Sequence, residues 1–249
     1  MLTYKEEIYM KPCIEVSNMT KAYSNRVVVD HLSFSVEQGE VFGLLGHNGA
    51  GKSTTIDCML GLTAMKEGSS LILGQEPAKH RKTLFQRIGV QLQDSHYQDA
   101  IKVIEACQEI AALYHQPADI NQLLKQFQLD SLKHQKVSAL SGGERQKLSV
   151  VLALLPDPEV IFLDELTTGL DVAARREVWK VLKALKQKGM TIFLTTHYME
   201  EAENLCDRVL ILKDGKKQVE GDVKAIISNS PYTTLEEAYL WYVGEEKLV

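Results

Sequence analysis

A glycine-rich run near the start of the chain has the residue types and spacing of a phosphate-binding loop. Residues 46–53 (GHNGAGKS) fit the pattern G-x-x-x-x-G-K-[ST] between an apolar segment and a helical one. Glycines let backbone N–H groups approach phosphate oxygens, the lysine supplies positive charge to β- and γ-phosphates, and the serine hydroxyl can bind Mg²⁺. A glycine turn without a ligand is the alternative, but the pattern arises by chance in only about one chain in a hundred of this length. The predicted nucleotide-binding residues here are Gly46, Asn48, Gly49, Gly51, Lys52, Ser53 and Thr54.

Two adjacent carboxylates follow a second apolar segment. Residues 160–163 (VIFL) predict a buried strand, and Asp164 and Glu165 come directly after it. Ligands bind at the carboxyl ends of strands in open α/β sheets, so Asp164 can hold Mg²⁺ directly or through water. Glu165 points elsewhere and can accept the proton of an attacking water as a general base. The alternative is that acidic residues simply end a strand at the surface.

A second glycine pair lies within residues 140–146 (LSGGERQ). Ser141 and Glu144 fit an N-terminal capping box. Capping does not explain Gly142 and Gly143, because each glycine in a helix costs about 1 kcal/mol relative to alanine. Backbone N–H groups that a phosphate can approach would explain both glycines. Since the first loop already covers one side of a nucleotide, this second anion site is predicted to serve a nucleotide held by a partner chain.

The composition excludes several classes of protein. A chain of 249 residues with 45% apolar content can bury a large core, and we expect one composite domain. The net charge of -5 disfavours a dedicated nucleic-acid binder, which usually carries a basic face. The four cysteines are scattered, without C-x-x-C spacing or a secretory signal, so we expect a reducing cytosol and neither a zinc site nor a disulfide framework. The longest apolar runs fall short of the ~20 residues of a membrane-spanning helix.

Strand patterns position the loop and the carboxylates in an α/β core. Residues 13–45 predict short strands broken by turn-forming pairs, and the last of them, 41–45, leads directly into the phosphate loop. Residues 160–163 and 191–195 predict two more strands, with an amphipathic helix around Val178 to Leu185 between them. Strands that alternate with helices in this way are typical of a buried parallel sheet.

Helical patterns occupy the middle and the end of the chain. After Gln93 the sequence carries two apolar stripes of helical period and stays helical to Leu155, which predicts a helical insertion at about 94–155. Near the end, Thr234 and Glu237 form a capping-box pattern, which predicts a short helix in the tail 231–249.

These motifs, in this order, resemble those of the ATPase subunits of ATP-binding cassette (ABC) transporters, over about residues 14–222. The resemblance implies a P-loop NTPase core with a mostly parallel sheet, an N-terminal antiparallel β-subdomain and an inserted α-helical subdomain, within a nucleotide-binding domain at 12–230. It implies Mg²⁺-dependent ATP hydrolysis by a dimer of cassettes, in which Ser141 and Gly143 bind the partner's nucleotide. It also implies a transmembrane permease on a separate chain, a cytoplasmic location on the inner face of the cell membrane, and no nucleic-acid partner.

Further residues acquire roles only through this resemblance. Tyr23 resembles the aromatic that stacks on adenine, although it could equally be an ordinary strand aromatic. Gln93 resembles the glutamine that senses Mg²⁺ and water, with Gln91 as the alternative. His197 resembles the switch histidine that contacts the γ-phosphate. Asp171 resembles the aspartate of a loop that crosses the dimer interface, and it can also cap the next helix.

The chain departs from the family pattern at two positions. His47 stands where many members have proline or serine, and Leu166 replaces the proline that often follows the catalytic glutamate. Neither position supplies a side chain to the family's chemistry, but Leu166 restores a backbone N–H and frees φ at the turn that holds Glu165.

The residues 195–203 and 235–239 resemble the exporter branch of the family, which includes drug, lipid and polysaccharide efflux systems; the cargo depends on the membrane partner. A cassette ATPase of DNA repair or ribosome rescue would carry a coiled-coil insert, a second cassette or a basic face, and the sequence has none of these. Residues 140–146 and His197 disfavour a P-loop kinase or GTPase. A nonenzymatic nucleotide-binding regulator is the remaining alternative, if Glu165 is misplaced.

Overall fold

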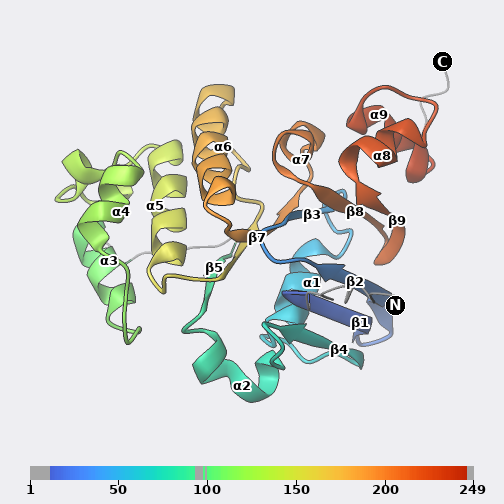
Figure 1. Ribbon diagram of the computed structural model, residues 1–249, viewed down its shortest axis with the longest axis horizontal. Helices are drawn as coiled ribbons and strands as arrows, with labels where there is room; N and C mark the ends of the chain where they lie inside the picture. Colours follow the sequence, from blue (N-terminus) through green and yellow to red (C-terminus); the bar gives the residue numbers. More distant parts are fainter. Residues whose placement is uncertain (1–11, 93–97, 99, 246–249) are drawn as a thin grey trace, which may run out of the picture.

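The structure of the chain is a computed structural model that describes residues 12–92, 98 and 100–245. Within these residues the strands form a three-stranded sheet of order β2-β1-β4 and a six-stranded sheet of order β5-β6-β7-β3-β8-β9 (Figure 1). The strands are β1 (Ile14–Tyr23), β2 (Arg26–Val36), β3 (Val41–Leu45), β4 (Glu67–Ile72), β5 (Ile88–Gln91), β6 (Val160–Asp164), β7 (Thr191–Thr196), β8 (Arg208–Lys213) and β9 (Lys216–Asp222). The helices are α1 (Lys52–Met59), α2 (Pro77–Leu84), α3 (Val103–Ala111), α4 (Ile120–Gln126), α5 (Gly142–Leu154), α6 (Val172–Gln187), α7 (Met199–Leu205), α8 (Val223–Ser228) and α9 (Leu235–Tyr242), with 3₁₀ turns at Asp130–Leu132 and Val137–Ala139.

Helices cover both faces of the six-stranded sheet. Its strands β5, β6, β7, β3 and β8 run parallel, and β9 pairs antiparallel with β8. In β6, Ile161 and Leu163 belong to the hydrophobic cluster that contains α6, whereas Val160 and Phe162 belong to the cluster that contains α1. Because neither face of β6 meets water, its sequence is continuously apolar rather than alternating.

The carboxyl ends of the three central strands meet at one edge of this sheet. Leu45 at the end of β3 lies opposite Thr196 in β7, and Asp164 at the end of β6 lies opposite Thr195. The segments that follow these strands therefore leave the sheet side by side. These are the phosphate loop, the segment that begins with Glu165, and the segment that contains His197.

The three-stranded sheet is the predicted N-terminal antiparallel β-subdomain. Its strands β1 and β2 are longer than the sequence suggested, 10 and 11 residues, and they pair from Ile14↔Val36 to Tyr23↔Arg26 across a two-residue turn. The apolar side chains of this sheet share a hydrophobic cluster with Ile56 and Met59 of α1. The sheet thereby packs beside the first helix after the phosphate loop.

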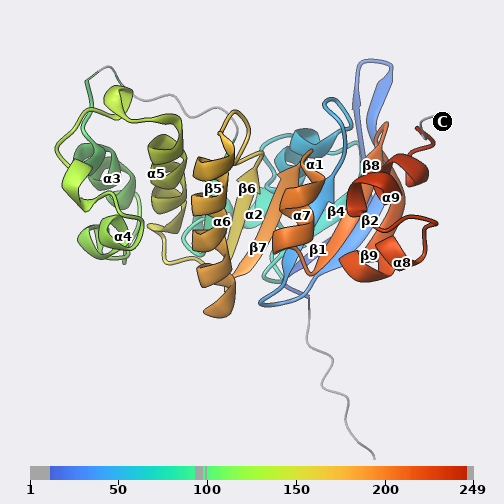
Figure 2. The ribbon, with the colours of Figure 1, turned by 90° about the horizontal axis from the view of Figure 1, so that it is seen from above.

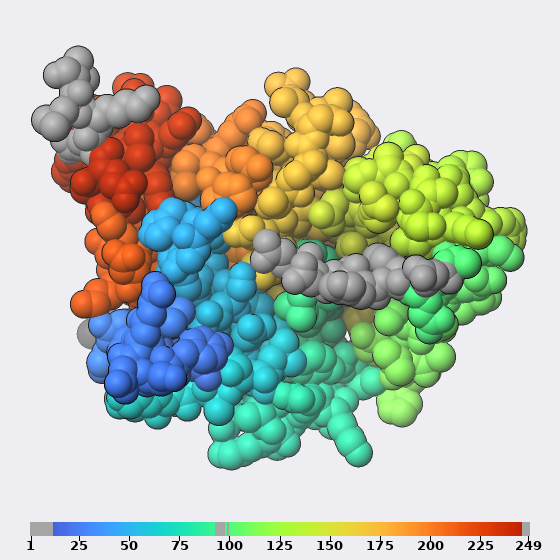
Figure 3. Space-filling view, turned by 180° about the vertical axis from the view of Figure 1, so that it is seen from behind, coloured from blue at the N-terminus to red at the C-terminus, as the bar shows by residue number. Residues whose placement is uncertain are grey.

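The helical insertion lies beyond the β5 edge of the six-stranded sheet, at the opposite end of the molecule from α8 and α9 (Figures 1 and 3). It contains α3, α4 and α5, as the apolar stripes predicted. Gly89 of β5 permits close contact with α5, because a Cβ there would lie 2.0 Å from the carbonyl oxygen of Ala153. Ile101, which the sequence placed on the first stripe, is buried just before α3 begins.

The C-terminal helices pack on the sheet that carries the phosphate loop, and Figure 2 shows them beside β8 and β9. Leu235 and Tyr239 of α9 are buried in one hydrophobic cluster with Leu45, the last residue of β3. Thr234 caps α9 by accepting the N–H of Glu237, as predicted. No helix in the described residues is both long and apolar enough to cross a membrane.

Candidate functional site

The phosphate loop joins β3 to α1 in a conformation that requires glycine. Gly49 and Gly51 have φ angles of +85° and +106°. A Cβ on Gly51 would lie 2.7 Å from the carbonyl oxygen of Val28, and one on Gly46 would lie 2.6 Å from that of Leu212. Side chains are excluded at these positions by φ and by close packing, so the backbone can curve tightly into the start of α1.

The turn between β8 and β9 supports the loop from the side. The N–H of Gly215 donates to the carbonyl oxygen of Ala50 at 3.0 Å, and the carbonyl oxygen of Gly215 accepts from Asp30 at 2.9 Å. The sequence reasoning did not identify this support, because it depends on strands that are far apart in the chain.

An open cavity of about 420 Å³ lies over the phosphate loop. The loop, the first turn of α1, strand β2 and the segment after β6 line it. The lining residues are Val28, Asn48, Gly49, Gly51, Lys52, Ser53, Thr54, Glu165 and Thr168. All except Val28 and Thr168 were candidates from sequence; Thr168 lies three residues after Glu165, whereas Val28 reaches the cavity only through the packing of β2.

Lys52 lies inside its own loop and faces Glu165. Its Nζ donates to the carbonyl oxygens of Gly46 at 2.9 Å and His47 at 3.1 Å. Nζ is also 3.0 Å from Oε1 of Glu165, and the two side chains are 3% and 8% exposed. An ammonium group has three N–H donors, and these three oxygens can accept all of them. A phosphate that enters the cavity must therefore compete with the carboxylate for the lysine.

Asp164 and Ser53 bring a carboxylate and a hydroxyl into contact, and Ser53 lines the cavity. Asp164 accepts a hydrogen bond from the hydroxyl of Thr195. Burial raises the pKa of Asp164, and hydrogen bonds from Thr195 and Ser53 partly offset this effect. Asp57, on α1, also has a raised pKa, first because it is partly buried and second because Asp164 is negatively charged.

A hydroxyl beside a carboxylate fits Mg²⁺, which prefers oxygen ligands and usually keeps several waters together with substrate phosphates. In the described part of the chain, no group of three or more His, Cys, Asp or Glu side chains is arranged as a metal site. The protein ligands that the structure describes thus suit an ion shared with a nucleotide.

Glu165 adopts a backbone conformation that is uncommon for its residue type. Its φ is +49°, in the left-handed region. Its N–H donates to Thr195, at 3.2 Å from the carbonyl oxygen and 3.1 Å from the hydroxyl oxygen. Leu166, the residue after Glu165, is buried in the hydrophobic core. Thr195, which the sequence analysis did not single out, thus contacts both Asp164 and Glu165.

His197 also lies beside Glu165. Its Nδ1 is 3.6 Å from Oε1 of Glu165, just beyond hydrogen-bond distance, and its side chain is 25% exposed. Its ring packs at 4.2 Å from the ring of Tyr198. The structure therefore brings Lys52, Glu165 and His197 together at one edge of the sheet.

Other predicted residues lie outside this cavity. Tyr23, at the end of β1, is 50% exposed, and Nζ of Lys21 lies 4.6 Å from the centre of its ring. Gln93 falls outside the described residues. Its alternative, Gln91, is buried at the end of β5, where its side-chain amide donates to the carbonyl oxygen of Leu92 at 2.7 Å.

The second glycine pair begins α5 on the helical insertion. Ser141 and Glu144 form the predicted capping box, in which the serine hydroxyl accepts from Glu144 at 3.3 Å and the glutamate accepts from the N–H of Ser141 at 2.8 Å. This N–H lowers the pKa of Glu144. Gly143 has an additional packing role, because a Cβ there would lie 3.0 Å from Cβ of Ala174 in α6. The exposed Gly142 has no such steric requirement.

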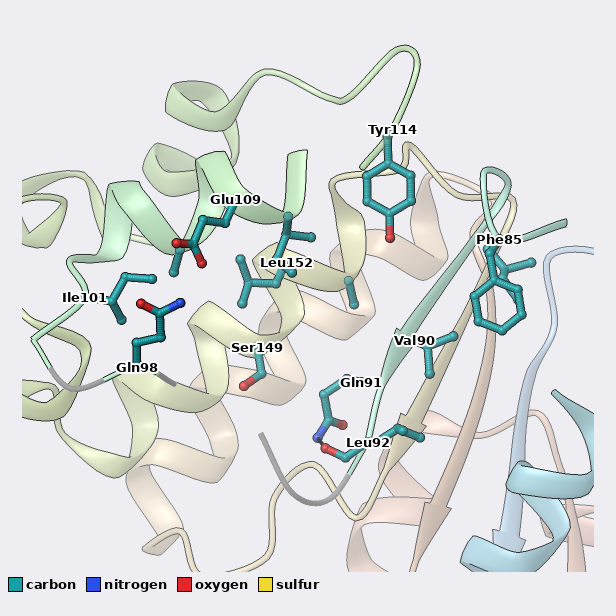
Figure 4. Close-up of a pocket in the computed structure, with 14 residues that line it drawn as sticks. Phe85, Val90, Gln91, Leu92, Gln98, Ile101, Glu109, Tyr114, Ser149 and Leu152 are labelled. Atoms are coloured by element: carbon teal, nitrogen blue, oxygen red, sulfur yellow. Dashed lines mark hydrogen bonds between the residues drawn. The ribbon is translucent and has the colours of Figure 1, made fainter. Parts of the chain in front are cut away.

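A groove of about 460 Å³ lies between the end of strand β5 and helices α3 and α5 of the helical insertion (Figure 4). Val90, Gln91 and Leu92 line it on the strand side, and Ser149 and Leu152 of α5 line it on the other. Ile101, Glu109, Ile110 and Tyr114 add a largely apolar wall from α3 and its flanks. Glu109 is the only charged residue in the lining that the structure describes.

The fold and the cavity define a P-loop nucleotide-binding protein, and comparison with known proteins narrows the class. Residues 29–168 match the ABC transporter family. The chain is 41% identical over 232 residues to Nod factor export ATP-binding protein I of Mesorhizobium japonicum, covering 91% of this chain and 68% of that protein. The protein of the same name from Ralstonia nicotianae is 38% identical over 233 residues, with coverages of 92% and 73%.

Solved structures agree with this assignment. An ATP-binding subunit of an ABC transporter has a TM-score of 0.82 at 28% identity, covering 92% of this chain and 99% of that one. The protein cbiO1 from Clostridium perfringens, part of the ABC transporter complex cbiONQ, has a TM-score of 0.75 at 25% identity, with coverages of 87% and 91%. This chain belongs to the ABC transporter family. It is an ATP-binding, ATP-hydrolysing subunit of such a transporter, and subunits of this kind work with membrane permeases.

Proposed function

We propose that two cassettes, each a copy of this chain or a related one, close over two ATP molecules. In each site Lys52 contacts the β- and γ-phosphates, the N–H groups at Gly49 and Gly51 surround them, and Tyr23 stacks on adenine. Ser141 and Gly143 of the opposite cassette cover the γ-phosphate. The proposal rests on one observation: the phosphate loop and the glycine pair after Ser141 lie apart in the structure. The cavity over the phosphate loop is open, whereas Ser141 lies outside its lining, on the helical insertion.

Within each site, one set of residues binds the metal ion and Glu165 activates the attacking water. Ser53, Asp164 and Gln93 hold Mg²⁺, which when bound neutralises phosphate charge. Glu165 accepts a proton from the water that attacks the γ-phosphorus in line, and His197 contacts the γ-phosphate. The 3.0 Å contact between Nζ of Lys52 and Oε1 of Glu165 supports an order of events in which ATP binds before water is activated. ATP binding draws the lysine toward phosphate, and the Glu165 carboxylate can then bind water.

The shared site is tested with a variant that binds ATP but hydrolyses it poorly. Glu165→Gln should form an ATP-dependent dimer, measured by size-exclusion chromatography with light scattering in ATP and in ADP. Adding Ser141→Arg should leave ATP binding by the monomer nearly intact and abolish the dimer, because the arginine blocks the surface that meets the partner's nucleotide. A monomeric Glu165→Gln chain that still binds ATP at high protein concentration would contradict the shared site. Loss of monomer binding in the double variant would place Ser141 in its own cassette's site.

We further propose that the membrane permease docks in the groove of Figure 4 through a short helix with an apolar face and a basic residue. The groove borders both the sheet and the helical insertion, so its occupant would contact both. Its wall is mostly apolar, and Glu109 offers a negative charge. In cells with the intact transporter, Glu109→Lys should lower the fraction of the chain recovered with membranes, whereas Glu236→Lys on α9 should not. Equal recovery of both variants would contradict this docking.

Export is the proposed direction of transport, with the chain on the inner face of the cell membrane. The support is the names of the relatives, which are Nod factor export ATP-binding proteins, together with the exporter-like residues 195–203 and 235–239. In inverted membrane vesicles that carry the complete transporter, ATP added outside should drive substrate into the lumen. Release from preloaded vesicles under the same conditions would indicate import.

A further inference from the structure

A buried glutamate outside the cavity contacts two segments that flank the reaction site. Glu201 lies in the first turn of α7 and is 3% exposed. Its Oε1 accepts the hydroxyl of Thr167 at 2.9 Å and the indole N–H of Trp179 at 3.0 Å. Burial of a carboxyl group is costly unless hydrogen bonds compensate for it, and an apolar side chain would fill the same space at lower cost. Packing alone therefore does not account for a glutamate here.

Two of the three segments that meet at this oxygen also carry a residue of the proposed mechanism. Glu201 follows His197 by four residues, and Thr167 follows Glu165 by two. Trp179 belongs to the third segment, α6, whose N-cap Asp171 resembles the aspartate of a loop that crosses the dimer interface. The hydroxyl of Thr167 and the indole N–H of Trp179 are neutral donors, and both donate to Oε1 of Glu201.

We infer that Glu201 is a positioning residue for ATP hydrolysis: it holds the Glu165 turn, the His197 segment and α6 in one arrangement. This inference rests on the proposed roles of Glu165 and His197. Glu201 is absent from the lining of the nucleotide cavity, so it acts through the other residues rather than on the nucleotide. Without Glu201, Oε1 of Glu165 and Nδ1 of His197 would no longer be held 3.6 Å apart.

The inference is tested by variants that remove the acceptor or retain it. Glu201→Leu removes both oxygens, whereas Glu201→Gln retains a carbonyl oxygen that can accept the same two hydrogen bonds. Glu201→Leu should lower kcat by about 10- to 100-fold, because small displacements of reacting groups have effects of this size. The dissociation constant for ATP should not change, since Lys52 and Ser53 are untouched. Glu201→Gln should restore most of kcat. Glu200→Gln, a change at the neighbouring exposed glutamate, is the matched control and should behave as wild type.

Donor variants decide the question if Glu201→Leu does not fold. Combining Thr167→Val with Trp179→Phe removes both donors while leaving Glu201 in place, and it should reproduce the loss of kcat with intact ATP binding. The inference is overturned if the donor variant has wild-type kcat, if ATP binding falls in proportion to kcat, or if Glu201→Gln is as slow as Glu201→Leu.

Glu165→Gln, measured in parallel, separates this inference from the proposed function. Normal hydrolysis in Glu165→Gln refutes the proposed base, whereas slow hydrolysis there with normal kcat in Glu201→Leu refutes only the positioning role.

Discussion

The variant Glu165→Gln tests the proposed base and the lysine contact in one protein. Glutamine keeps the size and the acceptor oxygen of glutamate but removes its charge and nearly all of its basicity. Water can still bind to it but is poorly activated, so ATP hydrolysis should fall by ~10²- to 10⁴-fold, the range for a positioned general base. Glutamine should tolerate the left-handed φ of +49° about as well as glutamate, so the backbone should not change.

The contact with Lys52 gives the expected change in stability. In the nucleotide-free chain, Nζ of Lys52 would lose a charged acceptor at 3.0 Å and keep a neutral one. Hydrogen bonds to charged groups contribute ~1.5–3 kcal/mol and neutral ones ~0.5–1.5, so the free energy of unfolding should fall by ~1–2 kcal/mol. Relief of repulsion with Asp164 favours the lower end of this range. For a chain of this length, the change corresponds to a decrease in Tm of about 2 to 8 °C.

ATP should reverse the loss of stability. When ATP is bound, phosphate replaces the side chain at position 165 as the partner of Lys52. The variant and wild type then make the same contact. Its ATP affinity should therefore equal or exceed that of wild type, by at most ~5- to 30-fold if the whole 1–2 kcal/mol appears in binding. ATP should consequently raise the Tm of Glu165→Gln more than that of wild type.

The measurements are phosphate release with Mg²⁺, thermal unfolding with and without ATP, and calorimetric titration with ATP. Glu177→Gln is the matched control, because Glu177 pairs with Lys180 at 2.7 Å on the exposed surface of α6. That variant should match wild type in all three measurements. Hydrolysis at the wild-type rate in Glu165→Gln would show that Glu165 is not the base. Weaker ATP binding would refute the competition between carboxylate and phosphate for Lys52.

Three further predictions follow from the same site and from the tail. Lys52→Ala should weaken ATP binding by about 10- to 150-fold in a calorimetric titration, since a charged phosphate contact is worth ~1.5–3 kcal/mol; unchanged affinity would refute its role. Burial raises the pKa of Asp164 above 3.8, so the folded chain holds that proton more tightly than the unfolded chain, and stability falls as pH rises through the folded-state pKa. Asp164→Asn should therefore raise Tm at neutral pH when neither nucleotide nor metal is present. The gain in Tm should disappear in acid, below the unfolded-state pKa of Asp164, and Mg²⁺-dependent hydrolysis should be abolished at all pH values. A lower Tm at neutral pH would contradict this reasoning. Deleting residues 232–249 exposes the apolar surface that Leu235 and Tyr239 cover and should lower Tm by at least ~5 °C; an unchanged Tm with failed assembly at the membrane would make the tail a partner contact.

The three central strands of the six-stranded sheet and the family could be predicted from short runs of sequence. The strand before the phosphate loop and the strand before Asp164 are buried on both faces, so each is a continuous apolar run that is visible without an alignment. The Ser141 capping box and the Asp171 cap were also predictable, because a cap depends on residues three positions apart. By contrast, the strands β4, β5, β8 and β9 and the helices α2, α7 and α8 were not predicted. Their sequences are short or mixed in polarity, and neighbouring elements stabilise them.

The sequence by itself determined the chemistry that this chain carries: a lysine and a serine after a glycine loop, two carboxylates after a buried strand, and a capped glycine pair elsewhere. Each of these signals is local, because it depends on residue types a few positions apart. Tertiary structure alone decided which side chains face each other. Lys52 pairs with Glu165, and Thr195 contacts both Asp164 and Glu165; the residues in each of these contacts are 30 or more positions apart. Glu201 is buried against residues that are 22 or more positions away. Strand register and helix packing set those distances, and both depend on the whole core.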